Sequence, residues 1–145
     1  MVYIMEEKRL AKEVCEQLIQ AAYEAKKMSY APYSNFHVGA ALLGKSGRIY
    51  PGCNIENAAY TPTNCAERTA VFRAVSDGER EFTAIAVAGD GDDYLAPCGV
   101  CRQVLQEFAE PEEFIVLMAG KGMDYRAMTL AELFPASFSK ADLEK

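Results

Sequence analysis

The sequence lacks any block of lysine and arginine, although it contains 15 of these residues in a total of 145. They are outnumbered by 21 aspartates and glutamates, which gives a formal net charge of −6. Such a chain repels a polyanion on average, and it has no local stripe of positive charge that could follow a phosphate backbone. We therefore expect no nucleic-acid partner.

Long apolar runs are also missing. The apolar residues from Met1 to Met5 are followed at once by charged residues, a pattern too short for a signal peptide, and no other run approaches membrane length. We therefore expect no membrane partner and a cytoplasmic location. Cysteines stay reduced there, and their odd number, five, favours metal binding or catalysis over a framework of disulfides.

No internal repeat, linker or low-complexity segment divides the sequence. Hydrophobic residues make up 50% and charged residues 25%, an ordinary composition for a globular protein. A chain of this length buries roughly 68 to 70% of the surface that its unfolded form exposes, so its core needs no disulfide or metal to be stable. We expect one domain that spans residues 1–145.

Hydrophobic periodicity predicts a helix followed by a strand hairpin in the first third of the chain. Apolar residues recur at helical spacing from Glu6 to about Met28. Residues 36–42 alternate as in a strand, and a Gly-Lys-Ser-Gly turn follows. Residues 48–53 then return as a second strand, antiparallel to the first.

The rest of the sequence alternates helices with buried strands. We predict a helix over Cys65–Asp77, with Thr63 or Asn64 as its N-cap, and another from Pro97 to near Phe108. The other predicted elements are strands over 82–89, 114–118 and 124–128 and a short helix from Thr129. The intervening helix makes the first two of these strands parallel, whereas a short link makes the last one antiparallel. These elements indicate an α/β fold.

Three cysteines and one glutamate form the most informative pattern. They lie in the runs Cys65-Ala66-Glu67-Arg68 and Pro97-Cys98-Gly99-Val100-Cys101, each at the start of a predicted helix. A structural zinc ion takes four protein ligands, whereas a catalytic zinc ion takes three and leaves a position for water. The three cysteines supply three thiolates, whose negative charge two helix starts favour. Glu67 has the right length to reach water at the open position.

Two other interpretations of these cysteines are open. Cys98 and Cys101 alone could be a thiol redox pair, because Cys-x-x-Cys at a helix start lowers a thiol pKa. Cys53 could complete a purely structural zinc site. Cys65 and the absence of tryptophan beside the pair favour a metal over redox chemistry, and Glu67 favours a catalytic metal. Arg68 can donate hydrogen bonds to thiolate sulfur and so offset the charge that three thiolates give to the metal.

The combination of Cys-Ala-Glu-Arg with Pro-Cys-x-x-Cys resembles the small, homotetrameric, zinc-dependent class of cytidine deaminases. Similarity over residues 30–36, 38–42 and 54–58 extends the resemblance to nearly the whole chain. It implies a three-layer α/β/α sandwich with a five-stranded mixed sheet and one zinc ion per chain. It also implies that Asn54 and Glu56 bind the ribose hydroxyls, that Phe36 packs against the nucleoside, and that the backbone of Ala66 holds the pyrimidine carbonyl.

The resemblance further implies hydrolytic deamination of cytidine or 2'-deoxycytidine, in pyrimidine salvage. Glu67 would move a proton from the attacking water to N3 of cytosine and would then carry a proton to the leaving ammonia. A deaminase of another aminopyrimidine nucleoside, such as a nucleoside antibiotic, would share the zinc residues, but Asn54 and Glu56 favour plain cytidine. His37 is interpreted as structural, because its side chain points to the strand face opposite Phe36.

The tail after Pro135 has no obvious place in the layers of this fold. A domain this small has few walls with which to enclose a nucleoside, and enclosure strengthens polar contacts to the transition state. The resemblance implies that Phe138 reaches into the active site of an adjacent subunit. The alternative is that Phe138 packs on its own domain. We expect a homotetramer of D2 symmetry.

Overall fold

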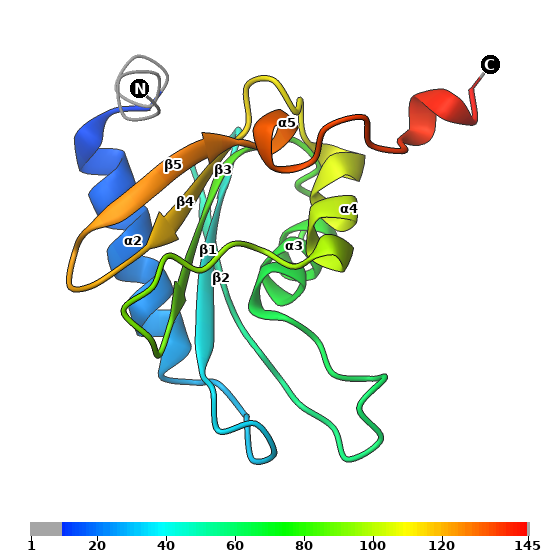
Figure 1. Ribbon diagram of the computed structural model, residues 1–145. Helices are drawn as coiled ribbons and strands as arrows, with labels where there is room; N and C mark the ends of the chain where they lie inside the picture. The colour runs from blue at the N-terminus through cyan, green and yellow to red at the C-terminus, as the bar shows by residue number, and fades with distance from the viewer. Residues whose placement is uncertain (1–9, 145) are drawn as a thin grey trace.

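A five-stranded sheet forms the centre of the computed structural model, which describes residues 10–144 (Figure 1). The strands follow the order β2-β1-β3-β4-β5 across the sheet. Their bounds are β1 Val38–Gly44, β2 Ile49–Cys53, β3 Phe82–Gly89, β4 Ile115–Ala119 and β5 Tyr125–Thr129. The helices are α2 Lys12–Lys26, α3 Ala66–Ser76, α4 Gly99–Phe108 and α5 Leu130–Leu133, followed by a 3-10 turn, η1, at Lys140–Asp142.

Helices cover both faces of the sheet, as the three-layer prediction requires. Helix α2 lies on one face, and α3 and α4 lie on the other (Figure 1). Side chains of a strand alternate between faces, so Ala40 and Leu42 of β1 pack with α3, whereas Ala41 packs with α2. The sheet is therefore the middle layer between two separate cores. Within residues 10–144, none of the helices has the length and hydrophobicity of a membrane-spanning segment.

The pairing of the strands agrees with the predicted topology. Strand β1 pairs antiparallel with β2 and with β3, β3 pairs parallel with β4, and β4 pairs antiparallel with β5. The crossover between the parallel strands contains α4, as expected for a connection of that length. The mixed sheet predicted from the sequence is therefore confirmed.

Two glycines let helices approach the sheet closely on opposite faces. A Cβ atom at Gly39 of β1 would lie 2.0 Å from the carbonyl oxygen of Ala22 in α2. A Cβ atom at Gly52 of β2 would lie 2.5 Å from the carbonyl oxygen of Ala66 and 2.4 Å from the amide nitrogen of Ala70, both in α3. The first turn of α3 therefore rests directly on β2, and this contact fixes where Cys65 enters the helix.

Some predicted boundaries are wrong by one or two residues. Strand β1 begins at Val38 instead of residue 36, because the carbonyl oxygen of Phe36 accepts a hydrogen bond from the Asn54 side chain and not from a neighbouring strand. Helix α2 begins at Lys12, and the earlier part of the helix predicted from Glu6 lies partly in residues 1–9, outside the described residues.

The start of α3 also differs from the prediction. Its N-cap is Cys65, not Thr63 or Asn64. Asn64 cannot cap the helix because its backbone pairs with Ile55 in an isolated antiparallel bridge, with N–O distances of 2.9 Å in both directions. The other end agrees with the prediction, since Gly78 has a φ of 95° just after the helix.

Candidate functional site

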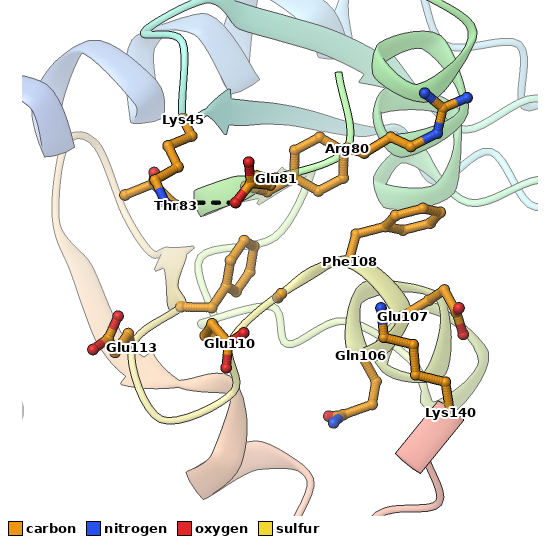
Figure 2. A pocket seen from close by; sticks show the side chains of 13 residues that line it. Lys45, Arg80, Glu81, Thr83, Gln106, Glu107, Phe108, Glu110, Glu113 and Lys140 are labelled. Carbon is orange, nitrogen blue, oxygen red and sulfur yellow. Dashed lines mark hydrogen bonds and ion pairs between the residues drawn. The ribbon is translucent and has the colours of Figure 1, made fainter. Parts of the chain in front are cut away.

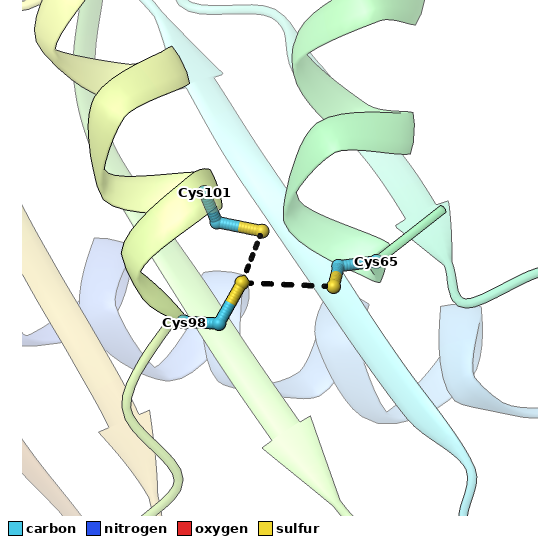
Figure 3. Close-up of side chains that lie close together, drawn as sticks. All are labelled: Cys65, Cys98 and Cys101. Atoms are coloured by element: carbon cyan, nitrogen blue, oxygen red, sulfur yellow. Dashed lines mark hydrogen bonds between the residues drawn. The ribbon is translucent and has the colours of Figure 1, made fainter. Parts of the chain in front are cut away.

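Three thiols lie together at the starts of two helices (Figure 3). Cys65 is the N-cap of α3, Cys98 is the N-cap of α4, and Cys101 lies in the first turn of α4. The Sγ atoms of Cys65 and Cys98 are 3.8 Å apart, and those of Cys98 and Cys101 are 3.5 Å apart. Both N-cap cysteines were expected in the first turn; they precede it because their backbones are extended, with ψ angles of 156° and 168°.

The spacing of these sulfur atoms fits a single zinc ion. Thiolates bound tetrahedrally at about 2.3 Å from zinc have sulfur atoms about 3.8 Å apart. The three sulfurs here lie within 4.8 Å of one another. A hydrogen bond from Cys101, helped by Arg68 and Cys98, lowers the pKa of Cys65 to about 5, and the same bond raises the pKa of Cys101. One thiolate is therefore already favoured at neutral pH, the form that a metal binds.

Arg68 places a positive charge against the thiols. Its Nη2 donates a hydrogen bond to Cys65 Sγ over 3.3 Å. Its Nε is buried and has no hydrogen-bond partner among the described residues. A buried cationic donor with spare capacity fits a set of three thiolates, whose combined negative charge it can offset. The charge-balancing role predicted for Arg68 requires this placement and stays a prediction.

Glu67 is buried next to the same cluster. Its side chain is 5% exposed and lies in the first turn of α3. Burial raises the pKa of Glu67 to about 7, and the negative charge of Cys65 adds to the increase. A carboxyl group is rarely buried to this extent for structural reasons alone, and such perturbed groups concentrate at functional sites.

A closed site with four cysteines is not formed. Among residues 10–144, Cys65, Cys98 and Cys101 are the group that could hold a metal, and Cys53 at the end of β2 lies outside it. Burial raises the pKa of Cys53, the opposite of what a ligand needs. The arrangement is therefore the three-thiol site expected for a catalytic zinc ion.

A family profile described as the cytidine and deoxycytidylate deaminase zinc-binding region matches residues 12–118, which include all three thiols and Glu67. The chain belongs to this deaminase family. A cytidine deaminase from Sporosarcina psychrophila is 53% identical over 128 residues, which cover 88% of this chain and 93% of the relative. One from Halalkalibacterium halodurans is 46% identical over 128 residues, with 88% and 96% covered.

Solved structures of the deaminase family have the same fold. The crystal structure of cytidine deaminase from Burkholderia pseudomallei superimposes with a TM-score of 0.80 at 47% identity, covering 84% of this chain and 97% of that one. The structure of cytidine deaminase from Mycobacterium tuberculosis gives a TM-score of 0.74 at 38% identity, with 84% and 94% covered. The cysteine cluster and the family together establish one zinc ion per chain.

In this deaminase, Asn54 and Phe36 lie side by side. Asn54 Nδ2 donates to the Phe36 carbonyl oxygen over 2.9 Å, and Asn54 Oδ1 accepts from the Val38 amide over 2.9 Å and from the Ser29 hydroxyl. A primary amide has two N–H groups, so one remains for a ligand. Phe36 is 39% exposed, and its ring is therefore not a core residue.

Glu56 binds the chain just before Phe36, at Tyr33 and Ser34. Its Oε1 accepts from the backbone amides of Tyr33 and Ser34 over 3.0 and 3.1 Å, and its Oε2 accepts from the Ser34 hydroxyl. Hydrogen bonds from Ser34 lower the pKa of Glu56, so the side chain stays a carboxylate. Glu56 lines a hollow of about 390 Å³ together with Tyr33, Ser34, Asn57, Tyr60 and Thr63.

Asp90 and Lys26, which the sequence did not single out, contact the residue after Phe36 and each other. Asp90 Oδ2 lies 2.7 Å from the backbone amide of His37, and its Oδ1 lies 3.2 Å from Lys26 Nζ. A signal was available: Asp90 directly follows the buried strand β3, and ligands of α/β proteins bind outside the carboxyl ends of such strands.

Phe138 lies away from the three thiols of its own chain. The chain after α5 leaves the body of the fold (Figure 1), and Phe138 is 57% exposed. Its carbonyl oxygen accepts a hydrogen bond from Gln103 Nε2 over 3.0 Å. Lys140, two residues further along the tail, lies with Gln106 and Phe108 near the end of α4, whereas the thiols lie at its start.

A second cavity, of about 530 Å³, lies at the end of α4 (Figure 2). A helix of ten residues is about 15 Å long, so this cavity is well separated from the thiols. Charged side chains surround it, including the ion pair of Lys45 Nζ and Glu81 Oε1 at 3.5 Å (Figure 2). The residues predicted to bind zinc and nucleoside, all within the described part of the chain, lie outside this cavity.

Proposed function

We propose that this chain hydrolyses cytidine and 2'-deoxycytidine to uridine and 2'-deoxyuridine with release of ammonia. The observation that carries the proposal is the buried Glu67 beside the cluster of three thiols, in a chain of the deaminase family. A hydrolytic deamination needs an activated water and a group that moves protons between water, ring nitrogen and leaving amine. The cluster and Glu67 provide both parts.

Cys65, Cys98 and Cys101 would hold the zinc ion, since their sulfur atoms have the spacing that zinc requires. A bound zinc ion supplies Lewis acidity and lowers the pKa of its water. Arg68 shares in the charge of the thiolates through its hydrogen bond to Cys65. This contact limits how much negative charge the ligands pass to the metal.

Glu67 would carry the protons of the reaction. Its carboxylate takes a proton from the attacking water, delivers it to N3 of the cytosine ring, and later delivers one to the leaving ammonia. Burial supports this role, because a carboxyl group out of bulk water keeps its protons for the substrate. General acid–base catalysis of this kind contributes about 10² to 10⁴-fold to a rate.

Four residues would orient the nucleoside. Phe36 offers an exposed aromatic face to the nucleoside, and Asn54 and Glu56 offer an amide N–H and carboxylate oxygens to the ribose hydroxyls. Ala66 is the first residue of α3, where backbone N–H groups are not used by the helix, and its amide would donate to the pyrimidine carbonyl. The segment from Tyr33 to Val38 is hydrogen-bonded to both Asn54 and Glu56.

The assembly that we propose is a homotetramer in which Phe138 of each chain completes a neighbour's site. Phe138 is exposed and its tail lies beside the later part of α4, away from its own thiols. Apolar side chains are exposed elsewhere too, including Met28, Ile55, Tyr60 and Phe72. A groove of about 710 Å³ between α2, β2 and α3 includes Met28 and Ile55. Extended apolar surface of this kind marks protein interfaces.

We further propose a single deaminase domain over residues 1–145, a cytoplasmic location and a role in pyrimidine salvage. The location follows from the five cysteines, which have no disulfide partner among the described residues and include three that must stay reduced to bind metal. The salvage role is proposed because both substrate and product are nucleosides.

The decisive experiment follows the ultraviolet absorbance of cytidine as purified protein is added. We expect the absorbance of cytidine to fall as uridine forms, a zinc chelator to stop the reaction, and added zinc to restore it. The same assay with 2'-deoxycytidine and with other aminopyrimidine nucleosides defines the substrate range. Unchanged absorbance with zinc-loaded, folded protein would refute the proposed function.

A further inference from the structure

The segment that carries Phe36 is held from two sides by side chains of other segments. On one side, Asn54 binds the Phe36 carbonyl oxygen and Glu56 binds the amides of Tyr33 and Ser34. On the other side, Asp90 accepts a hydrogen bond from the backbone amide of the next residue, His37, over 2.7 Å. Phe36 itself has no polar side-chain atom, so these contacts to its neighbours and backbone determine where its ring lies.

Asp90 contacts two side chains in addition to the His37 amide. The same Oδ2 atom that binds the His37 amide also lies 2.7 Å from Nδ1 of the His37 ring. Lys26 Nζ lies 3.2 Å from Asp90 Oδ1 and 3.3 Å from the carbonyl oxygen of Gly89. The backbone amide of His37 and the cation of Lys26 lower the pKa of Asp90, so the anchor remains charged. Helix α2, the end of β3 and the Phe36 segment therefore meet at one carboxylate.

The Phe36 ring packs against the backbone of Gly89, the residue before Asp90. A Cβ atom at Gly89 would lie 3.0 Å from Cζ of Phe36 and 2.8 Å from Cδ2 of Leu95. Both side chains therefore occupy the space that a larger residue would fill. Phe36 and Leu95 together form an apolar surface over the end of β3, and Leu95 is only three residues ahead of the thiol of Cys98.

We propose that Asp90 is a positioning residue for the nucleoside site, which fixes the Phe36 ring against Leu95, and that Leu95 is a second apolar contact of the nucleoside. The inference rests on the proposed function, because it assigns these residues to the binding of that substrate. Asp90 acts through the His37 amide, and Leu95 acts through direct apolar contact.

The expected effect of these residues is on binding. An aromatic ring held in place before the ligand arrives loses little freedom on binding, and this preorganisation raises affinity. Removing the anchor lets the ring and the Phe36 backbone move, so the nucleoside must order them again. The thiols and Glu67 belong to α3 and α4 and keep their contacts, so the chemical step should change little once substrate is bound.

The test compares three substitutions in one loop. Asp90→Ala removes the anchor, Asp90→Asn keeps an oxygen that can accept from the His37 amide, and Asp93→Ala removes an equal charge from an exposed position of the same loop. We measure kcat and KM for cytidine, the dissociation constant of the product uridine by calorimetry, and the zinc content. For Asp90→Ala we expect KM and the uridine dissociation constant to rise about tenfold, with kcat within twofold and zinc unchanged.

Asp90→Asn should recover at least half of that loss on a logarithmic scale, and Asp93→Ala should match the wild type. Equal effects of Asp90→Ala and Asp93→Ala, or a loss of zinc and kcat with unchanged KM, would overturn the positioning role. Leu95→Ala tests the apolar contact of Leu95 with the nucleoside separately and should raise KM for cytidine several-fold with zinc retained. An unchanged KM would remove Leu95 from the site. Wild-type protein that does not turn over cytidine would refute the proposed function instead.

Discussion

Arg68 Nη2 donates a hydrogen bond to Sγ of Cys65 over 3.3 Å, and the two residues are one turn apart at the start of α3. This contact joins a thiol of the metal cluster to a buried cation. Three thiolates give a zinc ion more electron density than three imidazoles would, which weakens its effect on bound water. The guanidinium group of Arg68 draws part of that density back.

We therefore expect Arg68→Ala to retain zinc but to slow turnover about 10 to 100-fold, because hydrogen bonds to metal ligands typically contribute that much. Zinc content and kcat for cytidine are the measurements. Arg73→Ala, on the same helix but bonded to the Pro51 carbonyl oxygen, is the matched control and should behave as the wild type. An unchanged rate in Arg68→Ala would contradict the charge-balancing role.

Glu67→Gln should keep the fold and the zinc ion and lose turnover by several orders of magnitude. The amide has nearly the same shape as the carboxyl group but cannot accept and return a proton. Turnover under saturating cytidine, zinc content and thermal unfolding check the three parts of the prediction. Glu107→Gln, at an exposed position of α4, is the control. Near-normal turnover in Glu67→Gln would remove Glu67 from the mechanism.

Cys98→Ser and Cys101→Ser should each lose the bound zinc and the activity, since two remaining thiolates hold the ion too weakly. About one zinc per chain is expected in the wild type, measured by atomic absorption after dialysis. Cys53→Ser provides the contrast: its thiol lies outside the cluster, so zinc should remain. Loss of zinc in Cys53→Ser would instead point to a closed structural site.

Glu79 should make stability depend on pH in the acid range. Its carboxylate accepts from the Ser46 amide over 3.1 Å and from the Tyr50 hydroxyl over 3.0 Å, and hydrogen bonds from Ser46 lower its pKa. A group with a lower pKa in the folded state stabilises the fold above its unfolded pKa of roughly 4.3 and stops doing so as the pH falls through the folded value.

Glu79→Gln should consequently lower the unfolding temperature slightly at pH 7 and by less at pH 3. Glu81→Gln, at a side chain that is 74% exposed, should change neither value. Thermal unfolding followed by circular dichroism between pH 3 and pH 7 separates the cases. A difference that persists unchanged at pH 3 would show that the hydrogen bonds of Glu79 do not depend on its charge.

Phe138→Ala should raise KM for cytidine more than it lowers the unfolding temperature, because the side chain is largely exposed within one chain and is proposed to act in a neighbour's site. Light scattering should give the mass of four chains for wild type. Met123→Ala, at an exposed position between β4 and β5, controls for the general loss of a large apolar surface group. A fully active monomer would refute the tetramer and the role of Phe138 together.

Much of the fold could be predicted because each signal is local. Strands with apolar runs, Gly78 after a helix and the capping box of Thr129 and Glu132 act within a few residues, and the structure confirms them. The zinc ligands could be predicted because their motif has a fixed spacing. Cys53 remained ambiguous only because sequence does not show distance in space.

Other features depend on contacts between distant segments, which no local pattern reveals. The backbones of Phe36 and His37 are hydrogen-bonded to the side chains of Asn54 and Asp90, so the strand begins later than its alternation suggests. Asn64 pairs with Ile55 and leaves the cap of α3 to Cys65. The anchoring of Asp90 by Lys26 joins residues 64 positions apart, and only the packing of α2 against β1 brings them together.

Helix α3 packs directly against Gly52, and this contact limits how the enzyme can be altered by directed evolution. Gly52 has no side chain with which to contact a ligand. Any larger residue there would nevertheless push against the carbonyl oxygen of Ala66 and shift α3, the helix that begins at Cys65. A library aimed at new substrates should therefore diversify residues such as Leu95 and leave Gly52 fixed. In a selection for activity, Gly52 should tolerate substitution as poorly as the cysteines do.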